Sequence, residues 1–115
     1  MPHFVFEYSR QNCDAKTVKK LLATAHEVGA ASNVMSADDI KARAIGYDDF
    51  QFAGDIDSFV HVTIRLLEGR TDAQKESLSV QMRTRLRAML PDVDSISVDI
   101  RDMNPIAYKK DLLTV

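Results

Sequence analysis

The second residue of the chain is a proline that directly follows the initiator methionine. Initiator methionines are usually removed before small residues such as proline, and removal would leave Pro2 as a secondary amine at the chain's end. An α-amino group titrates near 7.7–8.0, and burial or neighbouring cations lower that pKa. Pro2 is therefore a candidate general base, its nitrogen oriented by the ring. With Met1 attached the same nitrogen is an amide, and a proline opening a strand also suits a purely structural role.

Three cations form a second candidate group. Lys41 and Arg43 are separated by one residue in an alternating segment, so they project from the same strand face, and Arg70 follows a strand at a turn. Each of them alone reads as a solvated charge, and at a turn Arg70 is expected to contribute little packing. Beside a neutral amine, the three would bind a carboxylate and stabilise the negative charge of an enolate.

Other chemistry has weaker support in the sequence. His3, His26 and His61 fall on different predicted elements without helical i, i+4 spacing, so no metal site is predicted. Cys13 is the only cysteine, which excludes an internal disulfide and favours a buried free thiol. The sequence has no glycine-rich nucleotide-binding motif and no HExxH zinc motif. The acidic segment 48–57 lacks the ligand order of a calcium loop and is interpreted as solvated.

The composition is that of an ordinary globular domain. The chain has 115 residues, 45% of them hydrophobic and 28% charged, with a formal charge of −2. This length predicts a single domain over residues 1–115. The near-zero charge argues against a general nucleic-acid binder. Without a signal-peptide pattern or an apolar run of membrane-spanning length, we expect no membrane association and a cytoplasmic location.

Hydrophobic periodicity predicts the elements that position these residues. In the first half, residues 3–8 alternate as a strand, a helical apolar stripe follows an N-cap at Asp14, and Gly29 with Asn33 marks the helix end. Residues 40–45 alternate again, and residues 46–57 are interpreted as a hairpin or an irregular extension. The second half repeats the order with a strand over 59–66, a capped helix from Thr71 to Pro91, a strand over 95–101 and a tail.

Two β-α-β units of about equal length, residues 1–58 and 59–115, predict an α+β fold. Both helices are expected on one face of a four-stranded mixed sheet. The opposite face would carry Val5, Ile45 or their neighbours, and an oligomer is the simplest way to cover it. We therefore expect a closed assembly of copies around a symmetry axis.

Four segments together resemble a known enzyme family. They are Met1–Ser9 (MPHFVFEYS), Asp39–Ala44 (DIKARA), Phe59–Ile64 (FVHVTI) and Glu68–Thr71 (EGRT). They resemble the 5-carboxymethyl-2-hydroxymuconate isomerase family of the tautomerase superfamily, which includes 4-oxalocrotonate tautomerase and macrophage migration inhibitory factor. The resemblance extends essentially end to end. It implies a double β-α-β fold, a homotrimer, and catalysis without a cofactor or a metal.

The resemblance also implies roles for individual residues. Pro2 would be the catalytic base and Arg70 a catalytic, substrate-binding arginine. The family's other arginine lies in an Arg-x-Arg segment whose first position is Lys41 here and whose second is Arg43. Lysine keeps the charge but loses the planar fork that binds a carboxylate through two bonds, so either residue is a candidate substrate contact.

The reaction implied is the ketonisation of 5-carboxymethyl-2-hydroxymuconate, or of a similar small anionic unsaturated acid, in homoprotocatechuate degradation. One alternative is a related enzyme that acts on another unsaturated acid, with hydratase or dehalogenase character. A second alternative is a non-catalytic trimeric binding module with the same fold.

Overall fold

Two strand-helix-strand segments follow one another along the chain in the computed structural model, which describes residues 1–113. Six long elements carry the fold: β1 (His3–Ser9), α1 (Ala15–Ala31), β2 (Lys41–Tyr47), β3 (Phe59–Leu67), α2 (Asp72–Met89) and β4 (Ser95–Met103). Two short 3-10 helices, η1 (Arg10–Asn12) and η2 (Ala37–Asp39), lie in the connections. The predicted order of strands and helices is therefore confirmed.

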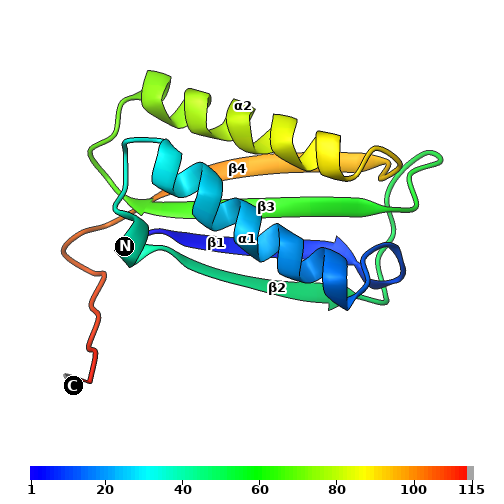
Figure 1. The fold of residues 1–115 in the computed structure, drawn as a ribbon, viewed down its shortest axis with the longest axis horizontal. Helices are drawn as coiled ribbons and strands as arrows, with labels where there is room; N and C mark the ends of the chain where they lie inside the picture. The colour runs from blue at the N-terminus through cyan, green and yellow to red at the C-terminus, as the bar shows by residue number, and fades with distance from the viewer. Residues whose placement is uncertain (114–115) are drawn as a thin grey trace.

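The four strands form one mixed sheet in the order β2-β1-β3-β4. The central strands β1 and β3 are antiparallel, and each outer strand runs parallel to the strand it pairs with. Both helices cover the same face of the sheet (Figure 1). The predicted α+β class is confirmed. Because of these directions, β1 and β2 begin where β3 and β4 end, and we call this the N-terminal end of the sheet.

The core lies between the sheet and the helices. Period-2 alternation sends every second strand residue toward the helices, and period-3.6 spacing gives each helix one apolar stripe. Phe4, Phe6 and Ile64 are completely buried, as are Leu21 of α1 and Met82 of α2. Alternation in β1 and β3 therefore decides which side chains remain on the other, open face.

Both long helices begin at side chains that satisfy free backbone N–H groups. The carboxylate of Asp14 accepts from the Thr17 N–H at 2.8 Å. At the start of α2, the Thr71 hydroxyl accepts from the Gln74 N–H at 3.1 Å, and the Gln74 amide oxygen accepts from the Thr71 N–H at 2.9 Å. The second arrangement is the capping box expected from the sequence, and it fixes the direction in which the chain enters α2 directly after Arg70.

The predicted end of the first helix is confirmed at Asn33 and wrong at Gly29. α1 continues through Gly29 to Ala31, and the chain leaves the helical path at Asn33, whose φ is 63°. Gly29 is inside the helix for a packing reason. A Cβ at this position would lie 2.7 Å from Cδ1 of Ile40 and 2.9 Å from Sδ of Met35. The absence of a side chain lets the segment before β2 pack closely on α1.

The open face of the sheet is more polar than the sequence led us to expect. At the N-terminal end, the residues paired across all four strands form a row of basic side chains, Lys41, His3, Arg65 and Arg101. Apolar side chains gather at the opposite end, where Ile45 is 54% exposed beside aromatic residues of β2, β3 and the segment 48–58. Of the predicted segment 46–57, residues 46 and 47 continue β2 and residues 48–57 form no strand, so the irregular interpretation is confirmed from residue 48 on and the hairpin is wrong.

Candidate functional site

Sheet topology brings three of the four predicted site residues to one place. Pro2 immediately precedes β1, Lys41 is the first residue of β2, and Arg70 lies three residues beyond β3. The backbone N–H of Lys41 donates to the Pro2 carbonyl at 3.0 Å. The beginnings of β1 and β2 and the end of β3 therefore meet at the N-terminal end of the sheet.

The side chain of Pro2 is fully buried. Its nitrogen belongs to the peptide bond with Met1, so the amino group of this chain is carried by Met1. Burial is the largest cause that lowers the pKa of this amino group below its ordinary value. Asp39 acts in the opposite direction. Three cations lower the pKa further, and they are Arg70, Lys41 and Lys110.

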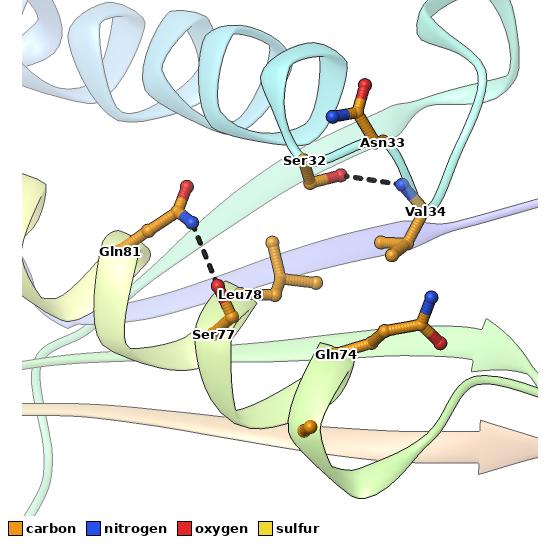
Figure 2. Close-up of a pocket in the computed structure, with 8 residues that line it drawn as sticks. Ser32, Asn33, Val34, Gln74, Ser77, Leu78 and Gln81 are labelled. Carbon is orange, nitrogen blue, oxygen red and sulfur yellow. Dashed lines mark hydrogen bonds between the residues drawn. The ribbon is translucent and has the colours of Figure 1, made fainter.

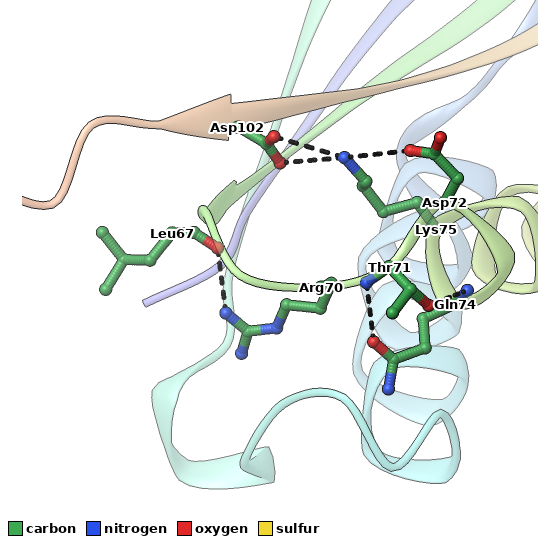
Figure 3. A network of polar contacts seen from close by, with 7 residues as sticks. All are labelled: Leu67, Arg70, Thr71, Asp72, Gln74, Lys75 and Asp102. Carbon is green, nitrogen blue, oxygen red and sulfur yellow. Dashed lines mark hydrogen bonds and ion pairs between the residues drawn. The ribbon is translucent and has the colours of Figure 1, made fainter.

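Arg70 is more than a solvated charge. Its guanidinium donates to the Val34 carbonyl from Nε at 3.0 Å and from Nη2 at 2.6 Å, and to the Leu67 carbonyl from Nη1 at 3.0 Å. Figure 3 shows the guanidinium lying under the turn that joins β3 to α2. The side chain ties this turn to the segment after α1, so the expectation that it contributes little packing is wrong.

The turn is also held from its other side. Lys75, in the first turn of α2, lies 3.2 Å from a carboxylate oxygen of Asp102 in β4 and 3.7 Å from one of Asp72 (Figure 3). Gly69, with φ of 127°, provides the backbone conformation that reverses the chain before Arg70. These contacts give Arg70 a defined position relative to the sheet.

Lys41 and Arg43 share a strand face but have different surroundings. Lys41 is half-buried, and its Nζ lies 3.5 Å from the carbonyl oxygen of Asp39. Arg43 is one residue pair further along the sheet, where its Nη1 donates to Nδ1 of His3 at 3.1 Å. Lys41 is among the charges that lower the pKa of the chain's amino group. Arg43 lowers the pKa of His3, and Lys41 does so to a smaller extent.

The contacts of His3 form a short polar chain that reaches the tail. Its Nε2 lies 2.9 Å from the hydroxyl of Tyr108, and the two rings meet edge to face with centroids 5.8 Å apart. Burial is the first cause that lowers the pKa of His3, followed by Arg43 and then Lys41. We did not predict this contact, because the tail has no periodicity that would place Tyr108 in space.

Two hollows in the described part of the chain lie away from this site. One, of about 280 Å³, lies between the end of α1 and the start of α2. Figure 2 shows its labelled hydroxyl and amide side chains, with Ser32 accepting from the Val34 N–H and Gln81 donating to Ser77. No residue lining it titrates, so it offers no acid or base. A larger hollow of about 420 Å³ lies on the open face at the aromatic end, lined by Glu7, Tyr47, Asp49, Phe50, Gln51, Phe52, Phe59, His61 and Ser97.

The remaining sequence candidates stay apart from this site. Cys13 is buried, and burial raises the pKa of its thiol, as expected for a structural cysteine and not for a nucleophile. His26 is exposed on α1, and Nδ1 of His61 contacts the Ser97 hydroxyl at 2.6 Å on the open face. Within residues 1–113, no three His, Cys, Asp or Glu side chains converge as metal ligands would.

Over the described part of the chain, no helix is both long enough and apolar enough to span a membrane.

Solved structures with the same fold come from several groups of proteins. A 5-carboxymethyl-2-hydroxymuconate isomerase from Deinococcus radiodurans R1 is 20% identical, covers 96% of this chain and 88% of its own, and has a TM-score of 0.80. A macrophage migration inhibitory factor-like protein from Entamoeba histolytica is 14% identical over 96% of this chain and 95% of its own, with a TM-score of 0.78. A fused 4-OT described as a symmetric trimer is 22% identical over 89% and 85%, with a TM-score of 0.74. At these identities the likeness shows the fold.

The sequence comparison decides the family. No curated protein matches the chain. The model of one protein family, 5-carboxymethyl-2-hydroxymuconate isomerase, matches residues 2–111 and so includes the whole sheet and both helices. Because this match extends over nearly the full length, the chain belongs to the 5-carboxymethyl-2-hydroxymuconate isomerase family.

Proposed function

We propose that the protein is a tautomerase whose base is the amine of Pro2 after removal of Met1. The neutral amine takes the proton of an enol hydroxyl, and the electron pair of that O–H bond becomes the new carbonyl π bond. The conjugated π electrons shift along the chain of the substrate. The protonated amine then returns the proton to a distal carbon, which completes ketonisation without a redox partner.

The observation that carries this proposal is the environment of the chain's amino group. Burial and nearby cations already hold the pKa of the Met1 amine below its ordinary value. Pro2 lies one residue further inward and is fully buried. An amine in that position loses the hydration that favours its charged form, which lowers its pKa and favours the neutral, basic form.

Lys41 and Arg70 supply the positive charges that complement an anionic substrate. We assign them to the substrate's carboxylate and to the negative charge that develops on its oxygen. Arg70 uses three N–H groups on the Val34 and Leu67 carbonyls. A guanidinium has five such groups, so two remain for a carboxylate. Arg43 is the alternative contact, and its bond to His3 makes it the less available of the two β2 cations.

The substrate we propose is 5-carboxymethyl-2-hydroxymuconate or a similar unsaturated hydroxy or keto polycarboxylate, in keeping with the family. We further propose a closed homotrimer, in keeping with the fused 4-OT of the same fold, which is described as a symmetric trimer. The uncovered sheet face and the unpaired outer strands β2 and β4 support an assembly of copies around an axis.

Blocking the amine tests the proposal. We would compare the chain that begins at Pro2, verified by mass spectrometry, with one that carries Gly-Ser before Pro2, which turns the nitrogen into an amide. Ketonisation is followed by ultraviolet absorbance. The blocked chain should lose about 10²–10⁴-fold in kcat/KM, the usual contribution of a general base. Pro2→Ala keeps a free amine and should retain intermediate activity. Equal activity in the blocked and free chains would overturn the assignment of Pro2.

A further inference from the structure

The tail after β4 leaves the sheet beside Pro2. β4 runs parallel to β3 and antiparallel to β1, so its last residue, Met103, lies at the N-terminal end of the sheet. Figure 1 shows the tail passing the amino terminus on its way from β4. The fold therefore brings residues 104–113 to the proposed site, although about a hundred positions separate the two in sequence.

Three contacts give this tail a defined path. The side-chain oxygen of Asn104 accepts from the Ile106 N–H at 2.8 Å. The backbone carbonyl of Asn104 accepts from the Tyr108 N–H at 2.9 Å, which closes a turn. The Tyr108 hydroxyl then lies 2.9 Å from Nε2 of His3. The residue next to Pro2 thus anchors the tail by its side chain.

Lys110 comes next along this path, and its ammonium faces Met1. Nζ of Lys110 lies 3.0 Å from Sδ of Met1, and its charge is one of those that lower the pKa of the Met1 amine. A thioether is only a weak acceptor for an ammonium group. Among residues 1–113, no carboxylate lies within ion-pair distance of Lys110. Removal of Met1 would therefore leave this charge facing vacated space in front of Pro2.

We propose that Lys110 is a substrate-binding residue that holds a second carboxylate of a polycarboxylate substrate. This proposal rests on the proposed function, because it requires the site that opens when Met1 is removed. Lys41 and Arg70 lower the pKa of the Met1 amine from β2 and from the turn after β3, and Lys110 contacts Met1 from the tail. Two groups of cations on different elements favour a ligand with carboxylates at both ends over one with a single carboxylate.

A pair of unreactive ligands isolates this contact. Muconate and sorbate are both six-carbon dienoates, and muconate carries a second carboxylate where sorbate has a methyl group. Isothermal titration calorimetry of the Met1-free protein, at one fixed ionic strength, would measure both affinities. Lys110→Gln should weaken muconate binding about tenfold and sorbate binding less than about twofold, as expected for one lost charge-assisted contact. Lys109→Gln removes an exposed neighbouring charge and should change neither affinity.

The outcomes separate this inference from the proposed function. Three outcomes would overturn the role of Lys110, whether or not the enzyme is active. Lys110→Gln could bind muconate with unchanged affinity, it could lose as much affinity for sorbate as for muconate, or the parent chain could fail to bind muconate. A preparation that shows the expected binding pattern but no ketonisation would remove the proposed function and leave the dianion site standing.

Discussion

The guanidinium of Arg43 donates a hydrogen bond to Nδ1 of His3 over 3.1 Å. A guanidinium has donors only, so Nδ1 must accept and the His3 ring must carry its proton on Nε2 when neutral. That proton points at the Tyr108 hydroxyl, 2.9 Å away. One contact between neighbouring strands thus fixes the tautomer of the residue beside Pro2 and the donor that holds the tail.

The first prediction concerns the pKa of His3. Burial and the Arg43 charge keep it below the ordinary value, so Arg43→Met should raise it toward that value. Titration of the His3 ring resonances by NMR would measure the change. Arg83→Met removes a charge from the exposed face of α2 and should leave the His3 titration unaltered.

His3 should also make the stability depend on pH. Because its pKa is lower in the folded state than the ordinary 6.5, the unfolded chain binds the proton first as the pH falls. The contribution of neutral His3 is complete above about pH 6.5 and is lost as the pH falls toward the folded pKa. The free energy of unfolding of the parent chain, measured by urea denaturation, should fall over this interval more steeply than that of His3→Gln. Parallel pH profiles would contradict this account.

A third prediction distinguishes the two cations of β2. Lys41 is among the charges that lower the pKa of the chain's amino group, and Arg43 is not among them. Removing a cation favours the protonated amine, so Lys41→Met should move the acidic limb of the kcat/KM profile to higher pH by roughly 0.3–1 unit. Arg43→Met is the matched control and should leave that limb in place. A larger shift in Arg43→Met would reverse the assignment.

Arg70→Ala should affect both stability and catalysis. Loss of its hydrogen bonds to the Val34 and Leu67 carbonyls should lower the free energy of unfolding by about 1–3 kcal/mol, as measured by urea denaturation. Loss of a substrate contact should raise KM by one to two orders of magnitude, roughly 1.4–2.7 kcal/mol. Arg70→Lys keeps the charge without the fork. If Arg70 binds substrate only as a charge, this variant should recover KM but not stability.

The start of α2 allows a test that does not depend on function. Thr71→Ala breaks the capping box directly after Arg70 and should cost about 1 kcal/mol of unfolding free energy. Ser36 precedes η2 without any capping hydrogen bond from its side chain, so Ser36→Ala should have little effect. Similar losses in both variants, measured by chemical denaturation, would count against the capping assignment.

Local patterns in the sequence determined the elements of this protein. Alternation over residues 3–8 and 59–66 predicted β1 and β3, and the residue types at Asp14 and Thr71 predicted the helix starts, because these signals depend on neighbours within a few positions. The same locality explains the error at Gly29. A glycine is a helix-end signal by propensity, and only the packing of Ile40 and Met35 against it shows why the helix continues.

The arrangement of the site was decided by tertiary structure. Antiparallel pairing of β1 with β3 brings Arg70 and the tail to Pro2, although no sequence pattern specifies which strands become neighbours. The hydrogen bonds of Arg70 to the Val34 carbonyl join residues 36 positions apart, and the contact of Tyr108 with His3 joins residues 105 positions apart. Such contacts depend on the spatial order of complete elements. The sequence therefore determined the strands, the helices and the candidate base, whereas the folded chain decided which side chains surround it.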